Sequence, residues 1–432
     1  MVGLKKEIRR AARLRGNVSV PPDKSLTHRS VMFSALAEGE STINNPLMAA
    51  DCLSTVSCVE ALGAEVKGSP GKWTVKGAGL WGFKAPVAPL DCGNSGTTMR
   101  LLSGILAAQP FDTRLVGDAS LSKRPMSRVA DPLRLMGVEI EMTNGKFAPM
   151  TIHGRRDIAP IDYKSPIASA QVKSCVLLAA LHAQGETSFE EPSLSRDHTE
   201  RMLSACGVEL RRNGARVSLR GPARLTPQTW DVPGDISSAA FFLVAGLLVP
   251  GASLRLLSVN LNPTRTGILD VLSSAGASVT IENERVSGGE PMGDLVIDSQ
   301  PPFRAFSIDK EIAPRLIDEV PILAVAATQA KGTTRLSGIE ELRVKETDRI
   351  AAIATNLRAM GGEVEESPDG LVIHGPTPLR GAVLDSFDDH RIAMAFAVAG
   401  LIADGTTIIE GADCVGISFP SFWDMFERLQ RP

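Results

Sequence analysis

The feature that most constrains the fold of this 432-residue chain is an internal repeat. A five-residue motif recurs. Its positions are, in order, an apolar residue, a glycine, a small residue, a residue that is usually glutamate, and an aliphatic residue. Its copies are LGAEV at 62–66, MGVEI at 136–140, CGVEL at 206–210, AGASV at 275–279 and MGGEV at 360–364. Each copy follows a helical pattern and runs into a strand-like pattern, so the glycine is predicted to end a helix.

A second phrase marks the same repeat and combines a small or acidic residue, an apolar helical run and a glycine-type turn. Its six copies begin near His28, Thr97, Ser169, Ser237, Glu319 and His390. Units of about 70 residues are longer than solenoid repeats, and the chain length favours two domains. We therefore expect two similar domains of three units each, with a crossing near TWDVPGD at 229–235. If the helices of a domain are parallel, their N-termini gather at one end and attract anions.

The composition argues against several classes of protein. A net charge of −3 and an aromatic content of 4% do not suit a nucleic-acid-binding surface. The longest uncharged stretch, 236–254, contains serines, glycines and Pro250, so it indicates a buried helix and turn rather than a membrane span. Six cysteines without metal-ligand spacing indicate buried free thiols in a reducing cytoplasm. They are Cys52, Cys58, Cys92, Cys175, Cys206 and Cys414.

The first candidate site segment is VPPDKSLTHRS at 20–30. Lys24, Ser25 and Arg29 stand where a proline-led loop enters a helix, with Arg29 one helical turn beyond Ser25. Two cations and a hydroxyl at the positive end of a helix suit a phosphate or a carboxylate. The alternative is a solvated first turn that Ser25 or Thr27 caps.

Two further loops of the first half lead into helices. In DCGNSGTTMR at 91–100, Asn94 and Gly96 form a small-residue loop before Arg100, and the segment lacks the P-loop pattern. In GDASLSKRPM at 117–126, Pro125 stiffens a loop that presents Arg124 for bidentate anion binding. An ordinary capped or solvated turn explains either loop equally well.

Small polar residues open two more segments. SPIASAQVKS at 165–174 carries Ser169 and Gln171, which could offer a phosphate neutral hydrogen bonds, although plain helix capping is the more common use. Ser195, in SLSRDHTER, leaves the same two alternatives open.

The second half contains a denser charge pattern. RVKETDR at 343–349 precedes an alanine-rich helix, and we expect Lys345 and Arg349 on one helical face, with Glu346 three residues before Arg349. DDHR at 388–391 places Arg391 at the opening of an apolar helix, and LIDE at 316–319 places Asp318 at another. Taken singly, each pattern is explained by the charged residues that are common at the first turn of a helix. Together, the cations of both halves predict a site for a polyanionic ligand; they are Lys24, Arg29, Arg100, Arg124, Lys345, Arg349 and Arg391.

These segments resemble the EPSP synthase family over essentially the whole chain. LDCGNSGTTMR at 90–100 and RVKETDR at 343–349 are similar to the two signature segments of the family, and KSLTHR, GDASLSKRPM, SAQ, LIDE and DDHR follow its order. The resemblance implies an α/β fold of two similar domains, each of three βαβαββ-type units, as an inside-out α/β barrel with the active site in the cleft between domains. It implies that residues 20–233 form the first domain and that residues 1–19 and 234–432 form the second.

The resemblance also implies the reaction and its residues. Phosphoenolpyruvate would donate its enolpyruvyl group to the 5-hydroxyl of shikimate 3-phosphate without a metal or organic cofactor. Asp318 would be the base and Glu346 the acid, with Lys24 assisting. Residues that match the family's shikimate 3-phosphate ligands are Lys24, Ser25, Arg29, Ser169, Gln171, Ser195, Asp318 and Lys345. Residues that match its phosphoenolpyruvate ligands are Lys24, Asn94, Gly96, Arg124, Gln171, Arg349 and Arg391.

Some departures and alternatives accompany the resemblance. Ile417 replaces a frequent lysine, Ala170 a serine, and Glu341 an asparagine that some members have. Gly96 suggests that glyphosate could fit. The related UDP-sugar enolpyruvyl transferases have a catalytic cysteine where this chain reads SLSKRPM. Transfer to another acceptor, such as UDP-N-acetylglucosamine, and a non-catalytic sugar-phosphate sensor are the alternatives. We expect a cytoplasmic monomer that acts on small molecules, with no nucleic-acid or membrane partner.

Overall fold

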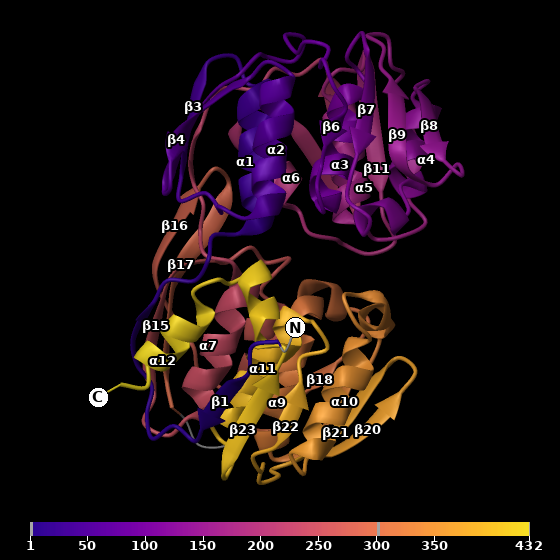
Figure 1. The fold of residues 1–432 in the computed structure, drawn as a ribbon. Coiled ribbons are helices and arrows are strands. Elements are labelled where there is room, and N and C mark those ends of the chain that lie inside the picture. The colour runs from indigo at the N-terminus through magenta and orange to yellow at the C-terminus, as the bar shows by residue number, and fades with distance from the viewer. Residues whose placement is uncertain (1–2, 300–302, 432) are drawn as a thin grey trace. The chain divides into compact units, whose positions relative to one another are not determined.

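The chain divides into two compact units in a computed structural model that describes residues 3–299 and 303–431 (Figure 1). The first unit contains Pro22–Pro233 and Val286–Glu290, and the second contains the residues up to Pro21, Gly234–Arg285 and the residues from Pro291 onward. Each unit buries a hydrophobic core of its own, rich in alanine, leucine, isoleucine and valine.

The elements of each unit follow one another as short strands and helices. Those of the first unit are α1 (Lys24–Leu36), β3 (Glu40–Asn44), α2 (Ala50–Ala61), β4 (Glu65–Ser69), β5 (Lys72–Lys76), β6 (Leu90–Asp91), α3 (Gly96–Leu106), β7 (Asp112–Val116), α4 (Ser127–Leu135), β8 (Glu139–Thr143), β9 (Phe147–His153), β10 (Asp162–Lys164), α5 (Ala170–Ala180), β11 (Gly185–Glu190), α6 (His198–Ala205), β12 (Leu210–Asn213), β13 (Arg216–Gly221) and β14 (Thr229–Asp231). The remaining elements are β1 (Lys6–Arg9), β2 (Arg15–Val18), α7 (Ile236–Leu248), β15 (Ser253–Asn260), α8 (Gly267–Ser274), β16 (Thr280–Ser287), β17 (Glu290–Asp298), β18 (Ser307–Ile308), α9 (Val320–Gln329), β19 (Gly332–Leu336), α10 (Arg349–Ala359), β20 (Glu363–Ser367), β21 (Gly370–Gly375), β22 (Val383–Asp385), α11 (His390–Gly400), β23 (Thr406–Glu410) and α12 (Phe422–Arg428).

Three of the six predicted repeats are continuous βαβαββ units. In the unit that runs from β6 to β9, the sheet order is β6-β7-β9-β8, with β6 parallel to β7 and the other neighbours antiparallel. The units from β10 to β13 and from β18 to β21 have the same order. The six-unit organisation that the repeated phrases predict is thus present in the sheets.

The other three sheets take one strand from a distant part of the chain. β14 pairs parallel with β3, and β2 pairs parallel with β15, so each supplies the missing first strand of its unit. In the sixth sheet, of order β1-β23-β22, β1 takes the place of a hairpin strand. The segment from α1 to β14 thus begins and ends in the same repeat unit, because β14 pairs with β3. A hydrogen bond of 2.8 Å from Asp23 N to Pro233 O also joins the two ends of this segment.

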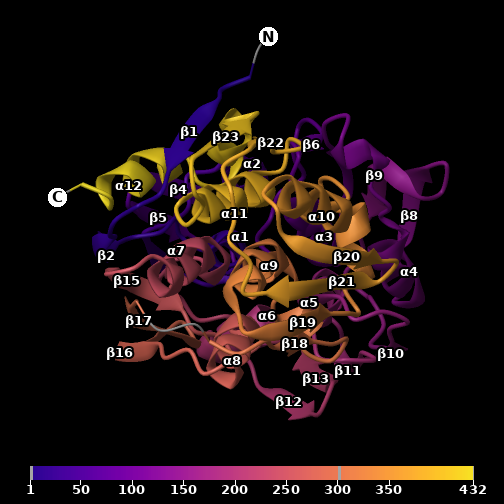
Figure 2. The ribbon, with the colours of Figure 1, turned by 90° about the horizontal axis from the view of Figure 1, so that it is seen from below.

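The expectation of an inside-out barrel needs one correction. Long apolar helices are buried inside each unit and the strands lie outside them, as expected (Figure 2). The described strands form six separate open sheets of three or four strands, and none of these sheets closes into a barrel. The strands are two to nine residues long, and each four-stranded sheet contains the strands of one repeat unit.

The five repeated glycines end helices as predicted. They have positive φ angles between 84° and 100°, which glycine adopts without steric cost. Gly63 N donates to Glu60 O at 2.9 Å and Ala64 N donates to Val59 O at 3.1 Å, a Schellman pair of bonds after α2. The same bonds follow α4, α6, α8 and α10 at Gly137, Gly207, Gly276 and Gly361.

Helices begin within one residue of five of the six predicted positions, as α3, α5, α7, α9 and α11, and α1 begins four residues before the sixth, His28. In the first unit, α3 packs closely on α5, because Gly104 has no Cβ; a Cβ there would lie 2.1 Å from Cys175 O. In the second unit, α9 packs against both α7 and α11. Over residues 3–299 and 303–431, no helix has the length and apolar character that crossing a bilayer requires.

Candidate active site

The start of α1 carries three of the candidate residues. Asp23 caps the helix by accepting a hydrogen bond from Leu26 N at 3.0 Å, so neither Ser25 nor Thr27 is the cap. Lys24 is half-exposed, and its Nζ lies 3.1 Å from Asp51 Oδ2 on α2. Lys24 therefore has an acidic partner within the first unit.

Arg29 lies one turn further along α1, and only 3% of it is exposed. Its Nε donates to Thr199 Oγ1 at 2.8 Å, its Nη2 to Ser174 Oγ at 2.9 Å and its Nη1 to Ser25 O at 3.0 Å. No acid among the described residues forms an ion pair with it. Burial lowers the Arg29 pKa to about 10, with Glu200 the first of the acids that oppose this shift. The guanidinium remains charged at neutral pH and is held by neutral groups.

The starts of α3 and α5 meet side by side (Figure 1). Arg100 Nη1 donates to Gln171 Oε1 at 2.7 Å, and Gln171 Nε2 donates to Thr97 Oγ1 at 3.1 Å. Ser169 is the N-cap of α5 and accepts from Val172 N at 3.4 Å. The predicted gathering of helix N-termini is confirmed here within the first unit.

Gly96 is the first residue of α3 and makes room for a neighbouring cation. A Cβ at this position would lie 2.7 Å from Arg100 Nη1 and 3.7 Å from Arg124 Nη1. Burial, followed by the charges of Arg128 and Arg124, lowers the Arg100 pKa to about 10. Gly96 therefore lets two guanidinium groups approach the positive end of α3.

The loops at 91–96 and 117–124 are joined by Asn94. Its Oδ1 accepts from Arg124 Nη2 at 2.7 Å, and its Nδ2 donates to Asp118 Oδ2 at 2.6 Å. The exposed Arg124 also donates to Ser120 Oγ at 3.2 Å. Arg124 is thus positioned by neutral groups and presents its charge at the surface of the first unit.

The hydroxyl group of the candidate residue Ser195 already donates a hydrogen bond within the protein. Its Oγ donates to Glu191 Oε2 at 2.6 Å, and 8% of the residue is exposed. It lies in the loop between β11 and α6 rather than at a helix start.

In the second unit, Arg349 joins three acids. Its Nε donates to Asp389 Oδ2 at 2.7 Å, its Nη2 to Glu346 Oε2 at 2.6 Å and its Nη1 to Asp318 Oδ1 at 3.5 Å. Asp389 is the N-cap of α11, and Asp318 lies in a 3₁₀ turn before α9. The structure therefore brings the predicted base and the predicted acid to one buried guanidinium.

The expected helical face of Lys345 and Arg349 is wrong. α10 begins at Arg349, after the N-cap Asp348, and a 3₁₀ turn at Glu340–Val344 precedes Lys345. Lys345 Nζ forms an ion pair of 2.5 Å with Glu341 instead. Lys345 lies outside the helix because Asp348 accepts from Ala351 N and fixes the start of α10.

Arg391 and Glu319 complete the helix starts of the second unit. Arg391 Nη1 donates to Asp318 O at 3.3 Å, and its Nε lies 3.9 Å from Asp318 Oδ1. Burial opposes the charge of Arg391, but Asp318 and Glu319 outweigh it and raise the Arg391 pKa. Glu319, the N-cap of α9, accepts from Ser237 Oγ on α7, and burial raises its pKa.

Three acids that form ion pairs with the candidate cations were not predicted as site residues: Asp51, Glu341 and Asp389. The position of Asp389, immediately before an apolar helix, is the usual sequence signal for an N-cap. Asp51 gave no such signal, because 27 residues separate it from Lys24.

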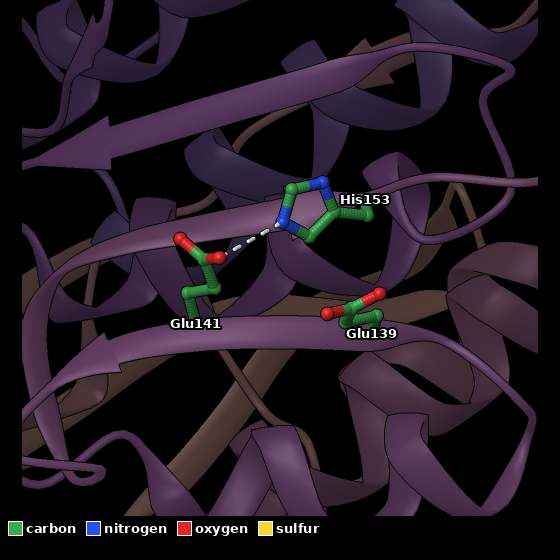
Figure 3. Close-up of side chains that lie close together, drawn as sticks. All are labelled: Glu139, Glu141 and His153. Carbon is green, nitrogen blue, oxygen red and sulfur yellow. Dashed lines mark ion pairs between the residues drawn. The ribbon is translucent and has the colours of Figure 1, made fainter.

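One group of described side chains has the spacing of a metal site (Figure 3). Glu139 and Glu141 on β8 lie beside His153 on β9, whose Nδ1 is 3.1 Å from Asp112 and whose Nε2 is 3.7 Å from Glu141. The two glutamates are exposed, and β7 and β8 begin where α3 and α4 have ended, so the group lies at the C-terminal ends of those helices. None of the candidate site residues belongs to it.

Repeat units with buried helices whose starts carry cations define the enolpyruvyl transferase fold. The enolpyruvyl transferase NikO from Streptomyces tendae shares this fold with a TM-score of 0.77 at 19% identity, over 99% of this chain and 97% of that one. The EPSP synthase structure from Acinetobacter baumannii matches with a TM-score of 0.92 at 44% identity, over 98% of both chains.

The family model of EPSP synthase (3-phosphoshikimate 1-carboxyvinyltransferase) matches residues 8–426. Relatives named 3-phosphoshikimate 1-carboxyvinyltransferase include proteins of Bacillus thuringiensis (strain Al Hakam) and Brevibacillus brevis. The first is 49% identical over 97% of both chains, and the second is 49% identical over 98% of this chain and 99% of its own. The chain belongs to the EPSP synthase family.

Proposed function

We propose that the chain transfers the enolpyruvyl group of phosphoenolpyruvate to the 5-hydroxyl of shikimate 3-phosphate, with release of phosphate. The observation that carries this proposal is the 49% identity over 97% of both chains to a relative named for this reaction. The cations at the helix starts support it, because both substrates are multiply charged anions.

The reaction consists of an addition and an elimination. In the addition, the 5-oxygen bonds to the enol carbon, the hydroxyl loses its proton and the methylene carbon gains one. In the elimination, phosphate leaves the tetrahedral intermediate and a methyl proton is lost, which restores the double bond. The chemistry therefore requires a base near the hydroxyl and an acid near the methylene carbon, each typically worth 10²–10⁴ in rate.

Asp318 is the proposed base and Glu346 the proposed acid, with Lys24 assisting proton transfer. Both carboxylates contact Arg349, at 3.5 Å and 2.6 Å. A substrate anion that binds Arg349 would compete with Glu346 for this guanidinium. Binding of phosphoenolpyruvate would thereby free the Glu346 carboxyl group to face the substrate.

The proposed ligands come from both units. Shikimate 3-phosphate is assigned to Lys24, Ser25, Arg29, Ser169, Gln171, Ser195, Asp318 and Lys345. Phosphoenolpyruvate is assigned to Lys24, Asn94, Gly96, Arg124, Gln171, Arg349 and Arg391. The arginines stabilise negative charge as it moves from the enol phosphate to the leaving phosphate, which is electrostatic stabilisation by groups already in place.

Transfer through a thiol is not part of the proposal. All six cysteines are buried, and burial raises the pKa of Cys206 to about 12 and that of Cys414 to about 11. A thiol in such surroundings stays protonated and is a poor nucleophile. A cytoplasmic monomer is the proposed working form.

The test is phosphate release by the purified protein with phosphoenolpyruvate and shikimate 3-phosphate in the presence of EDTA. Release that requires both substrates supports the acceptor, the donor and metal independence together. UDP-N-acetylglucosamine in place of shikimate 3-phosphate is the matched control and should give none. Release with the UDP-sugar alone would contradict the proposed acceptor, and binding of both substrates without release would favour a sensor.

A further inference from the structure

Lys173 is a buried cation that the proposed reaction does not use. It lies on α5, two residues after Gln171, and its side chain is 1% exposed. Its Nζ lies 2.7 Å from Glu191 Oε1, 2.9 Å from Glu200 Oε1 and 3.3 Å from Ser195 O. The two glutamate side chains are 0% and 3% exposed. An ammonium group in the interior thus holds together α5, α6 and the loop between β11 and α6.

This arrangement fixes Ser195 from both sides. Glu191 accepts from Ser195 N at 2.9 Å through Oε1 and from Ser195 Oγ at 2.6 Å through Oε2. Lys173 contacts the same Oε1 atom and the carbonyl oxygen of Ser195. The main chain and the hydroxyl of this proposed ligand of shikimate 3-phosphate are therefore set by one buried ion pair.

The same cluster reaches Arg29. Ser174 follows Lys173, Thr199 precedes Glu200, and both hydroxyls accept hydrogen bonds from Arg29 at 2.9 Å and 2.8 Å. The two hydroxyls are 2.6 Å apart. The Lys173–Glu200 pair joins α5 to α6. It therefore also fixes the spacing of Ser174 and Thr199, the two hydroxyls that accept hydrogen bonds from Arg29.

The charges of the cluster balance. Arg29 and Lys173 supply two positive charges, and Glu191 and Glu200 supply two negative ones. Without Lys173, two carboxylates would face each other in the interior, and one net negative charge would remain beside a site for an anionic substrate. Such a charge is weakly screened and acts strongly on nearby groups.

We propose that Lys173 is a positioning residue for shikimate 3-phosphate, and that it acts by holding Ser195 and the Arg29 partners in place. The proposal rests on the function proposed above. It assigns Lys173 no contact with either substrate and no part in proton transfer.

The test compares steady-state kinetics of phosphate release in Lys173→Met, Lys173→Gln and Lys173→Arg, with each substrate varied in turn. Lys164→Met is the matched control, because Lys164 lies on β10 of the same repeat and its side chain is 75% exposed. Thermal unfolding of each variant shows that it is folded at the assay temperature. We expect Lys173→Met and Lys173→Gln to raise the KM for shikimate 3-phosphate at least tenfold and to leave the KM for phosphoenolpyruvate within twofold. Lys173→Arg should be intermediate, at threefold or more, and Lys164→Met should change neither value.

Each outcome separates the two proposals. No release by the unaltered protein with shikimate 3-phosphate would defeat the proposed function. An active unaltered protein, with a shikimate 3-phosphate KM that Lys173→Met leaves unchanged or with equal changes in both KM values, would overturn the positioning role. Should neither neutral variant fold, Lys173→Arg decides: an unchanged KM for shikimate 3-phosphate in that variant overturns the role as well.

Discussion

Arg349 donates a hydrogen bond of 2.7 Å from Nε to Oδ2 of Asp389, and the two side chains are 1% and 0% exposed. Asp389 also caps α11 by accepting from Arg391 N at 2.8 Å. One carboxylate thus holds a guanidinium at the start of α10 and satisfies a free N–H group at the start of α11. The pair connects the stability of the second unit with the position of a proposed phosphoenolpyruvate ligand.

Replacement of Asp389 by asparagine should therefore destabilise the protein. The variant removes the fully buried carboxylate that pairs with Arg349, and breaking a buried ion pair typically costs about 3–5 kcal/mol. Urea unfolding followed by circular dichroism measures the change. Asp388→Asn is the control, because Asp388 has a φ of 54°, which asparagine tolerates, and forms no ion pair among the described residues. A loss below about 1 kcal/mol would contradict the structural role of the pair.

The same pair predicts a pH dependence of stability. Burial works against ionisation of Asp389, but Arg349 outweighs it and lowers the Asp389 pKa below its ordinary value of 3.8. A lowered carboxyl pKa stabilises the folded state above the unfolded-state pKa, and this contribution is lost as the pH falls further. The free energies of unfolding of the unaltered protein and Asp389→Asn should thus differ by a constant amount above about pH 5 and converge below about pH 4. A difference that is independent of pH between 2 and 6 would argue against this assignment.

Glu346→Gln should lower turnover far more than it weakens binding. Glutamine keeps an oxygen that accepts from Arg349 but cannot donate a proton as a carboxylic acid does. We expect kcat to fall by about 10²–10⁴, the usual worth of a general acid, while both KM values stay within about threefold. Glu340→Gln, in the 3₁₀ turn before Lys345, is the control and should keep full activity. Equal losses in kcat and in substrate binding would remove Glu346 from the role of proton donor.

Local signals in the sequence predicted the helices well. The glycine at each helix end and the apolar run after each helix start are properties of a few adjacent residues, and all five ends and six starts are present. The prediction that Lys345 and Arg349 share a helical face is wrong, because α10 begins only after the N-cap Asp348. Asp348 is one of five charged residues in this segment, and the charge pattern does not identify it as the cap. Capping depends on one side chain, and the charges around it carry no equivalent signal.

Long-range pairing could not be predicted in the same way. The strands β2 and β14 are four and three residues long, and each completes a sheet whose other strands lie far away in the chain. The partners of the candidate cations pose the same difficulty, since Arg349 meets Asp389 and Lys24 meets Asp51 only after the helices have packed. The candidate cations are visible in the sequence, whereas the acids that hold them are set by tertiary structure.

The close approach of α3 and α5 at Gly104 should be essential. A Cβ at this position would lie 2.1 Å from Cys175 O, a backbone atom that cannot move without shifting α5. Overpacking typically costs 1–3 kcal/mol and sometimes more, so Gly104→Ala should lower the free energy of unfolding by about 3 kcal/mol. It should also raise both KM values, because Gln171 would be displaced from Thr97 and Arg100. Gly416→Ala is the control, since no atom lies within 4 Å of a Cβ there. An alanine variant at 104 with normal stability would contradict this packing.

The ion pair between Lys345 and Glu341 should restrain the binding of shikimate 3-phosphate. Glu341 lies 2.5 Å from Lys345 Nζ, and its side chain is 67% exposed. Exposed pairs are typically worth up to about 1 kcal/mol, so Glu341→Ala should lower the KM for shikimate 3-phosphate by about two- to fivefold at low ionic strength. The gain should vanish near 0.5 M salt, because screening weakens the pair and the substrate contact alike. The measurement is KM against salt concentration, with Glu340→Ala as the control. A higher KM in Glu341→Ala would mean that Glu341 positions Lys345 for substrate instead of competing with it.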